Sequence, residues 1–372
     1  MKKIAAFALI IFIAFACDRQ VYFEPPILTL IDSLDYEQTP YALEIPEALP
    51  PQPPLGIELT VEGVELGKRL FYDPILSADG TQSCASCHNQ SLAFTDNGLQ
   101  YSVGIDGISG TKNSMALFNL AYYDKFFWNG RSPSLPHQAL LPVTDPVEMH
   151  NTWANAIEKI KADQTYTDMF FKAYDFAVID SSLVADAITQ FELTLLSGNS
   201  KFDKFMKVET QLTPQEFLGF EIFNREPRQT SFDKPGGDCF HCHGQPLFTN
   251  LDFMNNGLDA NLKLGLEEVT GDPFDKGKFK VPSLRNIEKT APYMHDGRFK
   301  TLEEVVEHYN SGVKITSTLA PIMLKADING NPTGIANGLF LTENEKAALV
   351  AFLKTLTDDD FLTNSKFAPP IN

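Results

Sequence analysis

Cysteine is scarce in this chain of 372 residues, which contains only five. Four of them form two close pairs, Cys84 with Cys87 and Cys239 with Cys242, and the fifth is Cys17. If each pair has a task of its own, no cysteine remains for a framework of disulfides. A long hydrophobic run is missing too, because the apolar segment 4–16 is too short to span a membrane.

Positive charge is also in short supply. Lysine and arginine together number 30 against 48 aspartate and glutamate residues, and the formal net charge is −18. So acidic a chain does not suit binding to nucleic acid, and it favours soluble partners such as a basic redox protein. The first half of the chain has no strand pattern of any length, which leaves helices as the expected elements.

The N-terminus has the pattern of an export signal. Lys2 and Lys3 precede the apolar run, and a small residue precedes Cys17. The end of this pattern is similar to the bacterial lipobox, which predicts removal of residues 1–16 and a lipid anchor at Cys17. The alternative is an ordinary signal peptide that leaves Cys17 unmodified. Either one predicts a location in the periplasm or cell envelope, and the proline-rich stretch that follows predicts a tether over 17–54.

Each cysteine pair belongs to a C-x-x-C-H motif that ends in His88 or His243. In this motif two thiols add to the vinyl groups of a haem and the histidine binds the iron. A redox dithiol or one zinc site with four cysteines are the alternatives, but both leave the repeated histidine as a coincidence. We therefore predict two covalently attached c-type haems. His241, inside the second motif, is expected to pack and not to bind iron.

Periodicity and capping signals place the helices. Helices are expected at 61–72, 152–162, 166–174 and 182–196, and after the capping residues Thr213, Thr301 and Thr342, with the first haem motif in a loop. The helix after Thr301 places Tyr309 on its inward face and turns His308 about a quarter of a circle away. The two halves share one plan, so the predicted fold class is mainly α, with two cytochrome c-like haem domains in tandem at 55–205 and 206–372 and long irregular loops.

From Leu66 to Leu356 the chain resembles the bacterial dihaem cytochrome c peroxidase family, which includes the MauG enzymes that complete a tryptophylquinone cofactor in another protein. The segments that carry the resemblance are 66–74, 112–114, 127–131, Gln138, 146–149 and 290–297. The resemblance implies that the first haem reacts with peroxide and the second receives electrons. It also implies that His88 and His243 are the proximal iron ligands.

Three further residues acquire roles through the resemblance. Glu148 matches an acid/base group over the open face of the peroxidatic iron, and Gln138 matches a residue that orients peroxide or water. The alternative for Glu148 is a solvated loop carboxylate. Trp128 matches a tryptophan between the two haems, which either serves as a stepping stone for electrons or packs the interface as a core aromatic.

The resemblance also implies a calcium site. Asn113, Thr290 and Pro292 match the family positions that bind calcium, and amide and carbonyl oxygens suit a hard cation. Asn113 could instead be a simple turn residue.

Two departures from the family pattern concern iron ligands. Where many members carry a histidine that blocks the peroxidatic iron, this chain has Ile105, and the stretch 89–123 contains no histidine. The resting iron is therefore expected to be open without reductive activation, although His137, His150 and Met115 remain as substitutes. Where many members carry a methionine ligand of the second haem, this chain has Tyr309, as MauG does. Met294 is the competing ligand.

The predicted function is an exported dihaem c-type peroxidase, a cytochrome-c peroxidase. It reduces hydrogen peroxide to water with electrons from a small redox protein, either a c-type cytochrome or a cupredoxin. One alternative is a MauG-like oxidation of a protein or aromatic substrate by peroxide. An alternative of another class is a dihaem electron carrier without catalysis. Membrane contact is expected only through the lipid anchor, and the family makes a homodimer possible.

Overall fold

The computed structural model describes residues 37–175, 178–227, 233–326, 332–336 and 338–370. Residues Gln38–Asn372 form one compact unit. The predicted signal segment, Cys17 and most of the tether lie outside the described residues. Within the described ranges, no helix has both the length and the apolar character needed to cross a membrane.

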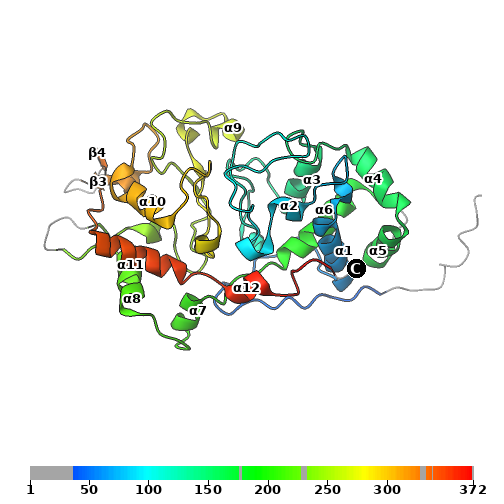
Figure 1. Cartoon of the computed structure of the whole chain (residues 1–372), viewed down its shortest axis with the longest axis horizontal. Helices are drawn as coiled ribbons and strands as arrows, with labels where there is room; N and C mark the ends of the chain where they lie inside the picture. The colour runs from blue at the N-terminus through cyan, green and yellow to red at the C-terminus, as the bar shows by residue number, and fades with distance from the viewer. Residues whose placement is uncertain (1–36, 176–177, 228–232, 327–331, 337, 371–372) are drawn as a thin grey trace, which may run out of the picture. The chain divides into compact units, whose positions relative to one another are not determined.

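The first half of the unit is built from helices (Figure 1). They are α1 (Val61–Tyr72), α2 (Cys84–Cys87), α3 (Leu135–Thr144), α4 (Trp153–Ala162), α5 (Gln164–Tyr174) and α6 (Ser181–Leu193). The next helix, α7 (Lys201–Met206), already packs on the second half, because Phe202 belongs to the core of that half. Helix α1 has the predicted bounds, and α4, α5 and α6 lie at the other predicted segments with small shifts at their ends. The first haem motif lies in the short helix α2 and not in a loop, because a single turn leaves no periodicity for the sequence to reveal.

The second half contains helices and four short strands. The helices are α8 (Pro214–Phe223), α9 (Glu267–Thr270), α10 (Leu302–Glu307), α11 (Glu343–Lys354) and α12 (Asp359–Thr363). The strands β1 (Phe253–Met254) and β2 (Phe279–Lys280) pair antiparallel, as do β3 (Leu324–Ala326) and β4 (Pro332–Ala336). The three predicted capping boxes are present. The side chains of Thr213, Thr301 and Thr342 each accept a hydrogen bond from a backbone N–H in the first turn of α8, α10 and α11, respectively.

Single turns connect these elements. The 3₁₀ turns are Pro74–Leu76, Gln90–Leu92, Leu120–Tyr122, Cys239–His241, Pro273–Asp275, Ile287–Lys289 and Pro321–Met323. After α10 the chain continues as a π-helical turn, His308–Gly312. The predicted helix after Thr301 is therefore shorter than its apolar pattern suggested. The fold is mainly α, as predicted.

A glycine allows the main helix crossing in each half. In the first half α1 crosses α6, and a Cβ at Gly67 would lie 1.7 Å from the carbonyl oxygen of Ala187. In the second half α8 crosses α11, and a Cβ at Gly219 would lie 1.9 Å from the carbonyl oxygen of Ala348. Both crossings therefore bring helix backbones into direct contact, which only glycine permits.

The hydrophobic cores follow the same duplication. Phe71 and Phe191 pack together beside the first haem motif, with ring centroids 5.3 Å apart. Phe223 and Phe352 pack beside the second, at 5.1 Å. These pairs come from the two crossing helices of each half, so the crossing and the aromatic core are one structural unit.

The C-terminal segment departs from a simple division of the chain in two. Phe361 and Phe367 belong to the core of the first half, and the Phe361 ring packs 5.8 Å from that of Phe94. Figure 1 shows the chain leaving α11 and passing α12 on its way towards α1. A boundary at 205/206 therefore leaves out residues that complete the core of the first half.

The glycine crossings can be tested within one helix. Gly67→Ala is expected to destabilise the protein by about 1–3 kcal/mol, because the added methyl meets a backbone carbonyl that cannot move aside. Gly63→Ala in the same helix is the comparison and should cost less, since the atoms nearest its methyl are the amide end of the Gln190 side chain and not backbone. Chemical unfolding followed by circular dichroism measures both. Equal stability of the two variants would contradict the close crossing.

Candidate functional site

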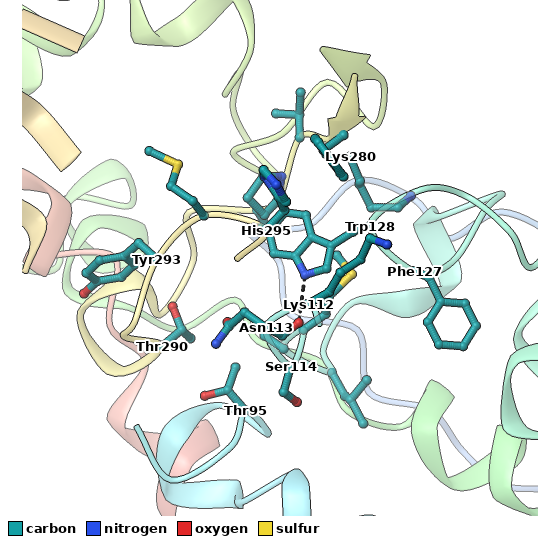
Figure 2. A pocket seen from close by; sticks show the side chains of 18 of the residues that line it. Thr95, Lys112, Asn113, Ser114, Phe127, Trp128, Lys280, Thr290, Tyr293 and His295 are labelled. Carbon is teal, nitrogen blue, oxygen red and sulfur yellow. Dashed lines mark hydrogen bonds between the residues drawn. The ribbon is translucent and has the colours of Figure 1, made fainter. Parts of the chain in front are cut away.

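Both haem motifs open onto one cavity of about 640 Å³. Its wall includes the four cysteines of the two motifs, which are free thiols, together with His88 and His243. Figure 2 shows the part of the wall where Trp128 and His295 lie, between chain segments from the two halves. The two candidate haem sites are therefore parts of one continuous space.

The two motif histidines are held in the same way. Nδ1 of His88 lies 2.6 Å from the carbonyl oxygen of Phe94, and Nδ1 of His243 lies 3.2 Å from that of Phe248. A carbonyl can only accept, so each Nδ1 carries the proton and each Nε2 is left bare for a metal. Burial lowers the pKa of both imidazoles, that of His243 to about 4, which keeps them in the neutral form that binds iron.

The loops that supply these carbonyls form a repeat that the sequence reasoning missed. Phe94 and Phe248 both adopt a left-handed backbone conformation, with φ of 59° and 55°. In each loop the motif histidine is followed by a glutamine two residues later, then by leucine and a Phe–Thr pair. Aligning the two halves on their motifs would have shown this.

These residues fit two c-type haems. Each motif offers two thiols and a neutral imidazole along the cavity wall. The cavity wall also includes the ammonium group of Lys280, which is buried and has no hydrogen-bond partner among the described residues. A buried unpaired cation suits an anionic group, and haem carries carboxylates. The donor chemistry and the sign of the charge therefore agree.

Glu148 and Gln138 reach the cavity from neighbouring positions. Gln138 lies on α3, which was not predicted as a helix, and Glu148 lies in the turn that follows it. The Glu148 side chain is half-buried, and this burial raises its pKa to about 7. The nearby Asp145 carboxylate raises the pKa further, and Arg131 opposes the shift. The structure thus brings a carboxyl group that titrates near neutrality into the cavity of the first motif.

The loop that carries Ile105 packs against the backbone of Glu148. The N–H of Ile105 donates to the carbonyl oxygen of Glu148 at 3.0 Å. A Cβ at Gly104 would lie 2.3 Å from the carbonyl oxygen of Val147, so the two segments are in close contact. This loop therefore fixes the backbone position from which the Glu148 side chain extends.

The three proposed substitutes for a blocking ligand have different positions. His137 is exposed and its Nδ1 lies 2.8 Å from Ser132 Oγ, while His150 is exposed and pairs with Asp106. Neither borders the cavity, but Met115 does. Among the described residues, the histidines that border the cavity are His88, His243 and His295.

Trp128 lies where the two halves meet. Its indole Nε1–H donates to the carbonyl oxygen of Asn113 at 2.8 Å (Figure 2). The N–H of Asn113 in turn donates to the carbonyl oxygen of His295 at 2.9 Å, and the N–H of Lys280 donates to that of Trp128 at 2.9 Å. Trp128 and His295 are followed by Asn-Gly-Arg and Asp-Gly-Arg, so they are counterparts in the two halves. The two backbone bonds are therefore reciprocal.

The predicted calcium residues share a stretch of the cavity wall. Asn113, Thr290 and Pro292 all border the cavity. The amide nitrogen of Asn113 donates to the carbonyl oxygens of Leu99 and Gln100, at 3.2 Å and 3.1 Å. The amide oxygen is therefore the group left to face a cation.

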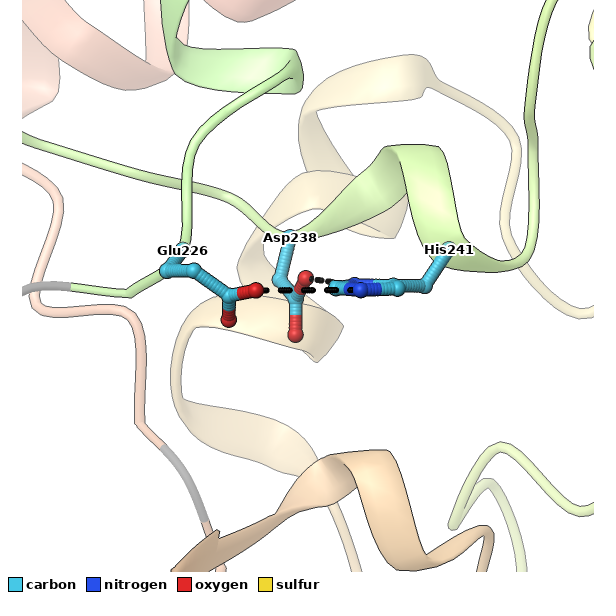
Figure 3. A group of neighbouring side chains, drawn as sticks. All are labelled: Glu226, Asp238 and His241. Carbon is cyan, nitrogen blue, oxygen red and sulfur yellow. Dashed lines mark hydrogen bonds and ion pairs between the residues drawn. The ribbon is translucent and has the colours of Figure 1, made fainter.

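His241 lies between two carboxylates at the edge of the second motif. Figure 3 shows Asp238 facing one ring nitrogen and Glu226 facing the other. The ring also packs on Phe240, with centroids 4.0 Å apart. The three side chains therefore form a small cluster at the edge of the second motif.

Tyr309 and Met294, the two candidate ligands of the second haem, both contact the side chain of Asn256. The amide nitrogen of Asn256 lies 3.2 Å from Tyr309 Oη and 3.4 Å from Met294 Sδ, and both side chains border the cavity. Burial raises the pKa of Tyr309 to about 12. His308 does not border the cavity, but it is buried and its Nε2 lies 3.1 Å from the carbonyl oxygen of Asn256. The expected helical phase does not apply to it, because α10 ends at Glu307.

Comparison with known proteins places this site in a family. A family model described as di-haem cytochrome c peroxidase matches residues 61–211. Cytochrome c551 peroxidase of Nitrosomonas europaea is 34% identical over 314 residues, which cover 83% of this chain and 84% of that protein. The MauG protein of Methylorubrum extorquens is 35% identical over 315 residues, covering 84% and 82%.

Solved structures agree. A MauG-like protein associated with microbial copper homeostasis superposes with a TM-score of 0.74 at 32% identity, over 89% of this chain and 99% of that one. The fold, the two haem motifs and these relatives lead to one conclusion. The chain belongs to the family of di-haem cytochrome c peroxidases and MauG proteins, and it holds two c-type haems.

Proposed function

We propose that this protein is a peroxidase that reduces hydrogen peroxide to two molecules of water, using two protons and two electrons. The observation that carries the proposal is Glu148, a half-buried carboxyl group with a pKa of about 7 in the cavity of the first motif. A plain electron carrier gives that carboxyl group no task. Proteins named cytochrome c peroxidase among the relatives support the same reaction.

The haem of the first motif supplies the iron that binds peroxide and accepts its oxidising equivalents. Glu148 in its ionised form takes the proton from one peroxide oxygen and delivers it to the other, which then leaves as water. Gln138 orients the peroxide or a water molecule by hydrogen bonds. No histidine among the described residues other than His88, His243 and His295 borders the cavity, and of the three suggested substitutes only Met115 does. The missing histidine supports a first haem that needs no prior reduction.

The two halves have separate tasks in this proposal. The first domain, 55–205 with the C-terminal segment packed on it, holds the peroxidatic haem, and the second, 206–372, holds the electron-transfer haem. Electrons enter from a c-type cytochrome or a cupredoxin and pass by way of Trp128. The protein works in the periplasm or cell envelope, held by a lipid at Cys17, and a homodimer is compatible with the family.

A calcium ion between the halves is part of the proposal. The amide oxygen of Asn113 is left over once its nitrogen has bonded two carbonyls, and Thr290 and Pro292 border the same cavity. Such neutral oxygens suit calcium, with water completing the coordination.

One observation favours a MauG-like alternative, in which peroxide drives oxidation of a protein or aromatic substrate. Tyr309 borders the cavity near the second motif, and its Oη accepts a hydrogen bond from Asn256. A tyrosine ligand lowers the potential of a haem, which makes the second haem a poorer acceptor from ordinary cytochromes.

Replacing Glu148 tests the acid/base role. Glu148→Gln is expected to slow the reaction of the oxidised protein with hydrogen peroxide by about 10²–10⁴-fold, measured by stopped-flow absorbance. In the parent the rate should rise with pH through about 7, because the carboxylate is the form that accepts the proton. Glu148→Gln should lose this dependence. A Glu148→Gln variant that reacts as fast as the parent would rule out the acid/base role of Glu148.

Asp145→Asn should shift the pH dependence of the same reaction rate without abolishing it. The Asp145 carboxylate raises the pKa of Glu148, so removing its charge should move the midpoint of the rate profile to lower pH. Asparagine keeps the side-chain oxygen that accepts from the N–H of Val147 at 2.9 Å, so the turn should persist. A profile that moves to higher pH, or does not move, would show that another group controls the rate.

Calcium is tested by removal. Treatment with a chelator should lower the unfolding temperature, and added calcium at a hundred times its dissociation constant should restore about 2.7 kcal/mol. Asn113→Leu should abolish the response to calcium, whatever its own stability. A protein that contains no calcium by elemental analysis and ignores the chelator would refute the site.

The sixth ligand of the second haem is tested by two single variants. If Tyr309 binds the iron, Tyr309→Phe should change the electronic spectrum of that haem and raise its potential, while Met294→Leu should leave both nearly unchanged. The opposite pattern would identify Met294 as the ligand and remove the main support for the MauG-like alternative.

A further inference from the structure

Lys280 is a buried cation whose ammonium makes no hydrogen bond within the described part of the chain. Only 3% of the residue is exposed, and its Nζ has no hydrogen-bond partner among the described residues. The nearest features are aromatic, since Nζ lies 4.9 Å from the ring centroids of both Tyr123 and Phe253. Figure 2 shows the side chain at the wall of the cavity, next to Trp128.

A buried ammonium destabilises the folded protein unless an anion pairs with it, and here that anion would have to come from a bound group. Aromatic faces stabilise an ammonium by less than the burial of an ion costs. Burial lowers the pKa of Lys280 to about 8, with Asp124 favouring the charged form and Lys125 opposing it. The ammonium is therefore still mostly charged at neutral pH, and it borders a cavity that holds haem.

The position of Lys280 in the duplicated fold gives a second, independent observation. Asn113 and Lys280 are counterparts, because each donates its backbone N–H across the interface to the residue before an Asn-Gly-Arg or Asp-Gly-Arg segment. Asn113 contributes a neutral amide to the cavity wall, whereas Lys280 contributes an ammonium group. The two halves thus differ in charge at matched points of the wall.

We propose that the Lys280 ammonium forms an ion pair with a propionate of a bound haem, beside Trp128, and raises the reduction potential of that haem. The chemistry that recognises the lysine is a carboxylate, and in this cavity the haems bring carboxylates of their own. The ion pair gives the buried ammonium a hydrogen-bonded anion and offsets the free-energy cost of burying it unpaired. A positive charge near the haem favours the reduced iron, because reduction adds a negative charge to the site.

Lys280→Met tests the proposal, since methionine keeps the apolar stem and removes the charge. The matched control is Lys112→Met. Lys112 borders the same cavity, but its Nζ lies 3.6 Å from a Glu268 carboxylate oxygen and its side chain is 26% exposed. Spectroelectrochemical titration of the holoprotein gives both potentials. A lower potential of one haem is expected in Lys280→Met, with Lys112→Met and Lys280→Arg close to the parent.

The sign of the stability change is a separate readout that a purely structural role would not reproduce. If Lys280 has no anionic partner, Lys280→Met relieves a buried charge and raises the unfolding temperature. If it pairs with a propionate, the same change leaves the carboxylate without a partner and lowers it. Potentials equal to those of Lys112→Met, together with a raised unfolding temperature, would overturn the proposal.

A folding failure is kept distinct by counting haems. Each variant is first assayed for two covalently bound haems per chain, and only such protein is titrated. Should Lys280→Met fail this check, Lys280→Gln retains a hydrogen-bond donor without the charge and is expected to lower the same potential. An unchanged potential in Lys280→Gln would then count against the ion pair.

Discussion

The hydrogen bond from each motif histidine to a backbone carbonyl is the constraint on which the rest of this structure depends. It fixes which nitrogen of the imidazole is bare, and so decides where an iron can be held. The carbonyls point the right way because Phe94 and Phe248 adopt a left-handed conformation, and both rings belong to the aromatic cores beside the helix crossings. Helix packing and metal binding are therefore coupled through two phenylalanines.

The reciprocal bonds between the halves have a similar role for the space between the haems. Asn113 and Lys280 each donate a backbone N–H across the interface, to His295 and Trp128. Because these are main-chain contacts, side chains at the same positions are free to differ. The counterpart of Trp128 is His295, whose ring stacks on Phe279 with centroids 3.6 Å apart. The counterpart of Asn113, a neutral amide, is Lys280. A symmetric scaffold in this way carries an asymmetric set of functional groups.

Much of this could be predicted from the sequence, for physical reasons. The motifs, the capping boxes and the helix over 61–72 are local patterns, and local patterns survive in the structure. The predictions failed where an element was too short to show a pattern, or where a contact joins residues far apart in the sequence. Helix α2 is a single turn, helix α3 has two prolines that weaken its signal, and the π-helical turn after α10 breaks an apolar period that had promised a longer helix.

Contacts between residues far apart in the chain were out of reach altogether. No spacing reveals that Asn256 lies between Tyr309 and Met294, or that the buried Lys280 ammonium has no hydrogen-bond partner among the described residues. The raised pKa of Glu148 likewise depends on packing that only the folded chain supplies. The family resemblance named Glu148 and Gln138, but not the loop around Ile105 that fixes the backbone beside Glu148.

The packing of Phe361 and Phe367 into the first half has a consequence for biosynthesis. Both residues follow the elements of the second half in the sequence, so the core around the first haem motif is completed only after the second half has been synthesised. Synthesis of the first half alone therefore leaves its aromatic core incomplete. The order of synthesis separates the appearance of the first motif from the completion of the core that packs beside it.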